Sequence, residues 1–149
     1  MKEAIQTLIT SDKMAHAFEY LKQDEAHTID QQIELVQISS FSPFEEKRAI
    51  RFKELLTEAG LDPVMDEVHN VYAHIHGTGN GPTLYVSAHL DTVFPPETPL
   101  PVKREGTKIY APGIGDDTRG LAEILTLARA IKESGLKPVG DIIIGGNVG

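Results

Sequence analysis

The first part of the chain is predicted to be helical, because its apolar residues recur at intervals of three or four. Between residues 5 and 39 they form two runs, and the polar stretch 22–25 separates them. This pattern predicts two helices, or one helix that is broken near His27. Thr28 and Gln31 have the spacing of a capping box, so the second helix is expected to start there.

A stronger start signal follows at Ser42. The serine can cap a helix, Pro43 suits the first helical position, and the glutamate at position 45 can reach back to the cap. Apolar residues at helical spacing follow, and Gly60 provides a left-handed stop. The sequence therefore predicts a helix over residues 43–59.

The hydrophobic period then changes from about 3.6 residues to 2. Residues 71–76 alternate apolar and polar positions, as in a half-buried strand, and residues 83–88 have the composition of a second, more buried strand. The glycine-rich stretch 77–82 between them favours a turn, so the two strands are predicted to form a hairpin. His74 and His76 fall on the polar face, where we expect solvation rather than metal chelation.

The second half of the chain has the order strand, long connection, helix, strand. Residues 94–101 carry four of the nine prolines and are expected to be irregular. Apolar positions from residue 121 onward share one helical face up to the stop at Gly135, and residues 141–144, with three consecutive isoleucines, predict a short buried strand. We predict an α/β fold with helices packed on a mixed sheet and at least one right-handed crossover.

Composition excludes several classes of function. The 149 residues are enough for one domain with a core, and 14 basic against 22 acidic residues give a net charge of −8. This charge disfavours nucleic acid as a partner. The absence of cysteine rules out a thiol nucleophile and a disulfide framework, which leaves histidines and carboxylates as metal ligands. No apolar run approaches the roughly 18 residues of a membrane span, so a cytoplasmic location with no membrane partner is expected.

The glycine-rich stretch 113–120 precedes a predicted helix, as phosphate-binding loops do. It lacks the third glycine of a dinucleotide fingerprint, because Thr118 stands there, and the lysine of a P-loop, because Leu121 follows Gly120. Asp116 and Asp117 instead put two carboxylates at the helix N-terminus, which repels phosphate and attracts a cation. A nucleotide-binding domain is therefore disfavoured. The competing interpretation is that the aspartates only cap the helix.

A second candidate group directly follows the strand at 83–88. His89 and Asp91 are two residues apart, so their side chains are expected on the same side of the chain. A histidine that binds a metal commonly donates its other ring N–H to a carboxylate, and Asp91 is in the right place to accept it. The competing interpretation is an ordinary hydrogen-bonded pair at the end of a strand.

In combination, these stretches resemble the di-zinc metallopeptidase family that includes peptidase T, glutamate carboxypeptidase, aminoacylase and succinyl-diaminopimelate desuccinylase, and peptidase T most of all. The resemblance is carried by His89-Leu90-Asp91-Thr92-Val93, by 110–117, and by the strand ending in 145–149. It implies that His89 binds one zinc ion, that Asp91 belongs to the catalytic machinery by clamping the imidazole, and that Asp116 bridges two metal ions. It further implies a cis peptide bond after Asp116, zinc with cobalt or manganese as alternatives, and hydrolysis of small peptides or N-acyl amino acids.

The chain departs from this family at two points. The family's Asp-Asp-Lys is replaced here by Asp-Asp-Thr at 116–118, and the family's Glu-Glu pair, which supplies a general base and a zinc ligand, is not among residues 1–149. We therefore expect residues 1–149 to be an incomplete zinc-exopeptidase-like catalytic domain without the lid domain and the C-terminal catalytic segment. The expected consequence is an inactive fragment that binds zinc weakly. The alternative is a non-catalytic remnant or binding module that keeps the fold.

Such a fragment is also expected to expose apolar surface. If the strand at 142–144 lacks neighbours, its unpaired edges favour pairing with another chain. The sequence thus predicts self-association into a homo-oligomer.

Overall fold

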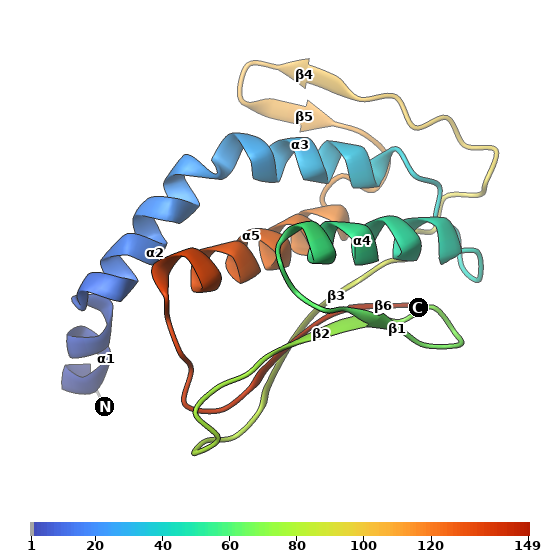
Figure 1. The fold of residues 1–149 in the computed structure, drawn as a ribbon. Helices are drawn as coiled ribbons and strands as arrows, with labels where there is room; N and C mark the ends of the chain where they lie inside the picture. The colour runs from blue at the N-terminus through green and yellow to red at the C-terminus, as the bar shows by residue number, and fades with distance from the viewer. Residues whose placement is uncertain (1) are drawn as a thin grey trace.

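The computed structural model describes residues 2–149 and places helices over a four-stranded mixed sheet, with a separate two-stranded hairpin (Figure 1). The helices are α1 (Lys2–Ile9), α2 (Asp12–Gln23), α3 (Glu25–Val36), α4 (Glu46–Glu58) and α5 (Thr118–Ser134). The strands are β1 (Val64–Met65), β2 (Val71–Ile75), β3 (Leu84–His89), β4 (Lys103–Glu105), β5 (Lys108–Tyr110) and β6 (Ile142–Asn147). None of the helices in residues 2–149 combines the length and the apolar character needed to cross a bilayer.

The predicted α/β fold on a mixed sheet is confirmed, but the predicted hairpin is wrong. The strand order is β1-β2-β6-β3, so β6 lies between the two strands that were expected to pair. It is antiparallel to β2 and parallel to β3. The backbone of the 77–82 turn also bonds outside the expected hairpin, since Thr78 N donates to Pro138 O at 3.0 Å and Asn80 N donates to Val139 O at 3.1 Å. The turn is therefore joined to the segment that leads into β6.

Burial follows from this strand order. The apolar strand β6 is paired on both sides, so the expected unpaired edges at 142–144 are not found. β3 instead forms the edge of the sheet in the described residues, and it is less buried than its composition predicted. Leu84 and Tyr85 are 56% and 54% exposed. A central position suits β6 because its isoleucines then contact neighbours on both sides.

The two helices predicted on either side of the polar stretch 22–25 are confirmed, and the break between them lies at Asp24; the alternative of one helix broken near His27 is wrong. Thr28 lies inside α3 and its hydroxyl donates to Asp24 O at 3.0 Å, so the predicted capping box is wrong. Asp24 itself is buried against α5, where its carboxylate binds Arg129. This long-range contact holds the junction at Asp24, inside the predicted polar stretch, whereas the capping-box signal had placed the helix start at Thr28.

Helix α4 begins three residues later than predicted. Residues 41–44 form a turn in which Phe44 N donates to Phe41 O at 2.6 Å, and the Ser42–Pro43 peptide bond is cis. The N-cap is therefore Glu45, without a side-chain capping bond. The predicted stop is confirmed, because Gly60 has a φ of +83° just after the helix.

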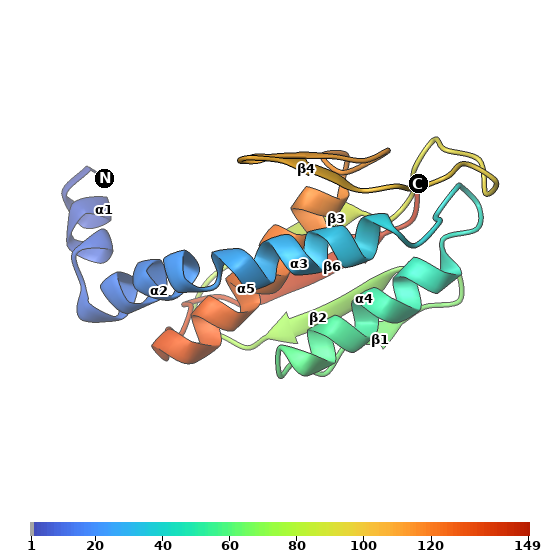
Figure 2. The ribbon, with the colours of Figure 1, turned by 90° about the horizontal axis from the view of Figure 1, so that it is seen from above.

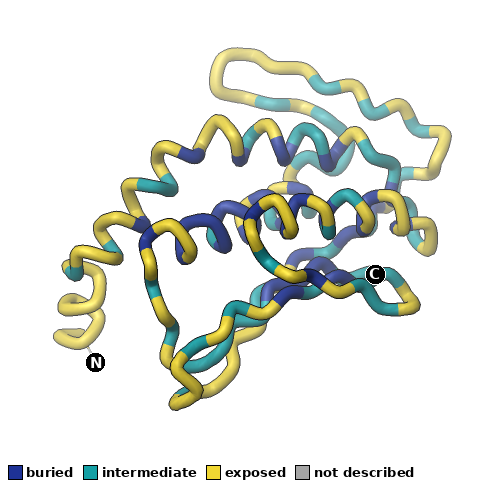
Figure 3. The backbone as a smooth tube through the Cα atoms, in the orientation of Figure 1, coloured by how far each residue is buried: buried dark blue, intermediate teal, exposed yellow. Residues whose placement is uncertain are grey.

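One face of the sheet is covered by α4 and α5, and α3 packs on α5 (Figures 1 and 2). The core lies between these two helices and the sheet, where the tube in Figure 3 is dark blue. Phe52 of α4, Leu121 of α5 and Ile144 of β6 are all fully buried there. The predicted helix α5 and its stop are confirmed, and Gly135 has a φ of +63°.

The segments outside this core are exposed. Residues 94–101 contain no helix or strand, as predicted, and His74 and His76 lie on the surface, as expected. The sequence predicted helix from residue 5 onward, but it did not predict that α1, whose eight residues include none that is buried, is separate from α2. It also did not predict the short hairpin of β4 and β5. This hairpin lies beyond α3 on the helical side of the molecule (Figure 1).

Candidate metal centre

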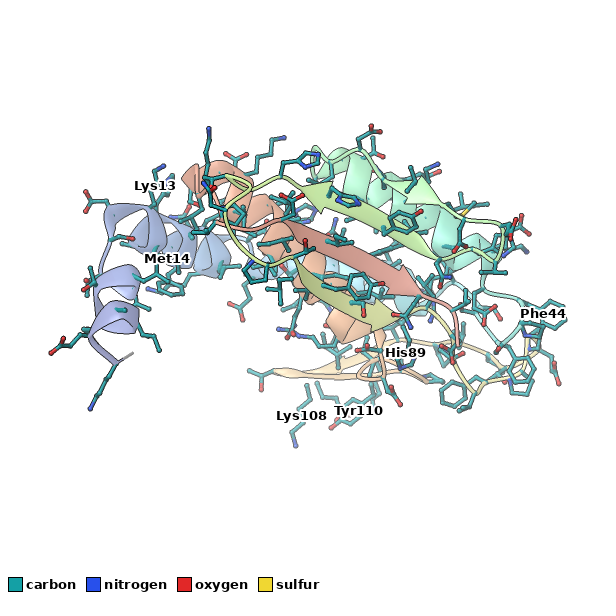
Figure 4. All side chains as sticks on the ribbon, turned by 90° about the horizontal axis from the view of Figure 1, so that it is seen from below. Lys13, Met14, Phe44, His89, Lys108 and Tyr110 are labelled. Carbon is teal, nitrogen blue, oxygen red and sulfur yellow. The ribbon has the colours of Figure 1, made fainter. Side chains whose placement is uncertain are left out.

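The predicted site residues come together at one end of the sheet. His89 is the last residue of β3, and Asp91 follows two residues later. Asp116 lies in the loop that leads into α5, whose N-terminus is at the same end. Figure 4 shows His89 at the tip of its strand. The carboxyl ends of strands and the amino ends of helices are where α/β proteins build their sites.

The imidazole of His89 lies between two carboxylates. Its Nδ1 is 3.1 Å from Asp91 Oδ1 and 3.1 Å from the Asp91 carbonyl oxygen, while its Nε2 is 2.9 Å from Asp116 Oδ1. The Asp91 side chain is 21% exposed, whereas the Asp116 side chain is 90% exposed. The ring is thus held from the protein side and directs Nε2 toward an open carboxylate.

Asp117 contacts main-chain N–H groups and not the His89 ring. Its Oδ1 accepts from Gly120 N at 3.1 Å, which caps α5, and its Oδ2 accepts from His89 N at 3.3 Å. The capping interpretation therefore holds for Asp117, while Asp116 points to His89. The peptide bond between the two aspartates is cis, as the family resemblance implied.

The electrostatics of the site favour positive charge. Burial by itself would lower the pKa of the His89 imidazole, but the hydrogen bond to Asp116 and the negative charges of Asp91 and Asp117 outweigh it and raise this pKa above 6.5. Because both ring nitrogens face oxygen acceptors, the metal-free site favours the protonated ring. A metal cation bound at Nε2 in place of the proton would be attracted by the same aspartate charges.

Two side chains, those of Gln32 and Thr118, hold the loop before α5, and the sequence predicted this role for neither of them. Gln32 of α3 is buried, and its Nε2 donates to Ile114 O at 2.6 Å. The Thr118 hydroxyl is 3.1 Å from both Gly113 O and Ile114 O. Arg119 contacts Gln32 and Glu123 rather than the site. No local motif marks Gln32 and Thr118 for this role, because the loop atoms that they bind are main-chain carbonyls, which the fold makes available.

A cavity of about 280 Å³ adjoins the histidine. His89, Asp91 and Asp116 contribute polar atoms to its wall, and Val93, Phe94 and Ile114 contribute apolar surface. The cavity is therefore lined both by the charged cluster and by apolar side chains.

The residues present fit a metal ion in part. Imidazole and carboxylate are suitable zinc donors, and the pair His89 and Asp116 already converges. Within residues 2–149, however, no group of three or more histidines and carboxylates is placed to hold a metal ion. A catalytic zinc usually has three protein ligands, and His89 and Asp116 are two candidates for such donors.

Comparison with known proteins agrees with this geometry. Residues 85–148 match the sequence profile of Peptidase family M20/M25/M40. The chain is 38% identical over 77 residues to carboxypeptidase G2 of Pseudomonas sp. (strain RS-16), an alignment that covers 50% of this chain and 18% of that enzyme.

Two solved structures share the fold. A tripeptidase from Staphylococcus aureus has a TM-score of 0.67 at 30% identity, covering 82% of this chain and 36% of that chain. The aminopeptidase PepT from Bacillus cereus has a TM-score of 0.67 at 25% identity, covering 80% and 35%. The chain thus spans about a third of the length of these two peptidases.

The matched residues include both His89-Leu90-Asp91 and the Asp116–Asp117 loop, the two stretches that build the cluster. The predicted resemblance to the di-zinc metallopeptidases is therefore confirmed at the level of the family. The chain is related to peptidase family M20/M25/M40 through residues 85–148, and it has the fold of the N-terminal part of such peptidases.

Proposed function

We propose that this chain forms part of the metal centre of a hydrolase that cleaves small peptides or N-acyl amino acids. The observation that carries the proposal is the placement of His89, with Nδ1 on Asp91 and Nε2 on Asp116. A histidine ligand needs one nitrogen engaged and the other directed at the metal, and this arrangement provides both.

Each of the three residues has a distinct role in the proposed centre. His89 and Asp116 are zinc ligands, and Asp116 is the carboxylate that could bridge two ions, because a carboxylate has two oxygens and this side chain is accessible from solvent. Asp91 accepts a hydrogen bond from the Nδ1–H group of His89, which leaves the Nε2 lone pair available to the metal. When bound, zinc supplies Lewis-acid activation of the scissile carbonyl and of water.

The peptide substrate class is supported by the relatives and by the cavity. The two solved relatives are named a tripeptidase and an aminopeptidase, and the curated one a carboxypeptidase. The apolar wall of Val93, Phe94 and Ile114 beside the cluster suits an apolar side chain of the substrate.

The donor set also predicts how the chain behaves alone. With two protein ligands, the 149 residues are expected to bind zinc weakly and to leave peptides intact. Hydrolysis of a tripeptide by the purified chain, if it were lost in His89→Ala, would contradict this expectation.

Calorimetric titration with Zn²⁺ tests the proposed centre. His74 and His76 stack on the surface with ring centroids 5.8 Å apart and could bind zinc adventitiously, so the titration should use a background with both changed to alanine. In that background, we expect His89→Ala and Asp116→Asn to abolish the binding heat.

Unchanged binding after His89→Ala would refute the assignment. Binding of a peptide without any dependence on zinc would favour a non-catalytic binding module instead. Repeating the titration with Co²⁺ and Mn²⁺ ranks the metals, and the absorption spectrum of bound Co²⁺ reports the ligand geometry.

A further inference from the structure

A buried arginine lies behind the His89–Asp91 segment, and the proposed centre does not account for it. Arg48 of α4 is 1% exposed. Its Nη1 donates to Leu90 O at 2.8 Å, and its Nη2 and Nε donate to Ile38 O at 2.6 and 3.2 Å. No carboxylate oxygen of residues 2–149 lies within 4.0 Å of its nitrogens, so its hydrogen-bond partners are main-chain carbonyls alone.

Ser40 acts on the same carbonyl. It is fully buried, and its Oγ donates to Leu90 O at 2.7 Å. Its own carbonyl accepts from Thr92 N at 2.7 Å, and Phe41 and Thr92 form a parallel bridge. The segment before α4 therefore runs alongside the residues that follow β3. The Leu90 carbonyl accepts two hydrogen bonds, which uses both of its lone pairs.

The charge of Arg48 needs an explanation, because burial of a cation is costly when hydrogen bonds alone compensate it. Burial lowers the pKa of Arg48 to about 10, and the negative charge of Asp91 counteracts this effect. The guanidinium therefore remains charged at neutral pH. The negative charge of Asp91 thus offsets part of the cost of burying the Arg48 guanidinium.

We propose that Arg48 and Ser40 are positioning residues that direct Asp91 at His89. The Leu90 carbonyl and the Asp91 amide belong to one planar peptide unit, so two donors on the carbonyl fix the orientation of that unit. The orientation of this peptide unit determines the position of the Asp91 Cα atom. It therefore determines whether the carboxylate can reach His89 Nδ1, which it contacts at 3.1 Å. This inference rests on the proposed function, since it takes His89 as the metal ligand that Asp91 orients.

A purely structural role would have different consequences. Arg48 also ties α4 to the end of β3, and its loss would lower stability whether or not it positions Asp91. Arg129 provides a matched control, because it is likewise a buried arginine, at 8% exposed, but it binds Asp24 and Gln31 away from the site. A variant at Arg129 should lower stability and leave His89 unaffected.

The experiment follows the His89 imidazole by long-range ¹H–¹⁵N NMR of the metal-free chain, at a pH above the pKa of the ring. Nδ1 faces two acceptors of Asp91, whereas Nε2 faces one oxygen of the exposed Asp116 side chain, so we expect the proton mainly on Nδ1 in the wild type. In Ser40→Ala and Arg48→Met, we expect the population with the proton on Nε2 to increase. The Arg129→Met control should keep the wild-type His89 spectrum. Arg48→Lys retains the positive charge but lacks the several fixed donors of the guanidinium group. It should therefore show more of the Nδ1–H signal than Arg48→Met does.

A second readout is the affinity for Zn²⁺, which we expect to fall about tenfold in Ser40→Ala, as is typical when a supporting contact of a ligand is lost. An unchanged His89 spectrum in Ser40→Ala, or in a folded Arg48→Met, would overturn the proposal. If His89 binds no metal, the zinc readout disappears in the wild type as well. The imidazole spectrum does not depend on metal, so the two proposals fail separately.

Discussion

The buried carboxylate of Asp24 joins the start of α3 to α5. Its Oδ2 accepts from Thr126 Oγ1 at 2.7 Å and from Nε and Nη2 of Arg129 at 2.9 and 2.5 Å. Both side chains of the ion pair are at most 10% exposed. Asp24→Asn keeps the shape of the side chain but leaves the guanidinium buried without a counter-charge.

Removal of one partner of a buried pair costs roughly 3–5 kcal/mol of unfolding free energy. For a chain of 149 residues, this corresponds to a decrease in melting temperature of about 10 °C or more. Urea unfolding followed by circular dichroism at pH 7 measures the loss. As a control, Glu19→Gln breaks the exposed Glu19–Lys22 pair and should cost less than about 1 kcal/mol.

The pH dependence gives an independent check. Burial by itself would raise the pKa of Asp24, but the hydrogen bonds from Thr126 and Arg129 and the arginine charge lower it below its ordinary value of 3.8. The contribution to stability is therefore complete above about pH 4–5 and is lost as the pH falls through the folded-state pKa. The stability difference between wild type and Asp24→Asn should shrink in acid. A loss below 1 kcal/mol at pH 7, or a difference that persists in strong acid, would refute the reasoning.

Three further predictions concern the core and the site. Phe52→Ala should lower the free energy of unfolding by about 3–5 kcal/mol, measured by urea unfolding, because the ring is fully buried. Gly146→Ala should cost about 1–3 kcal/mol in the same assay, since its Cβ would stand 2.8 Å from Phe52 Cε1; a neutral result would contradict the close packing. Asp117→Ala should cost about 1 kcal/mol through loss of the α5 cap while leaving Zn²⁺ binding measurable by calorimetry, unlike Asp116→Asn.

Much of the local structure was predictable from short-range patterns. The helix at 118–134, the strands at 71–75 and 84–89 and the stops at Gly60 and Gly135 follow from hydrophobic period and glycine chemistry, which act within a few residues. The candidate site residues were also accessible, because His89 with Asp91 and the Asp116–Asp117 pair each lie within a short stretch. Their assigned roles as ligands and clamp remain predictions.

Other features depended on contacts between distant residues. Two consecutive strands with a glycine turn favour a hairpin locally, but the isoleucines of β6 are better buried between them, and only the sheet as a whole decides that order. The break at Asp24 likewise depends on Arg129, which lies 105 residues away in the sequence. Local capping rules could not locate it.

The sequence by itself thus determined which chemistry is available at the end of β3: one imidazole, two acidic residues at a helix N-terminus, and no thiol. Only the tertiary structure decided how these groups are used. It separated the two aspartates into a helix cap and a partner of His89, and it placed the buried Arg48 and Ser40 behind Leu90. The reason is physical: hydrogen bonds to main-chain carbonyls carry no signature in the side-chain pattern, and they exist only after distant segments have packed together.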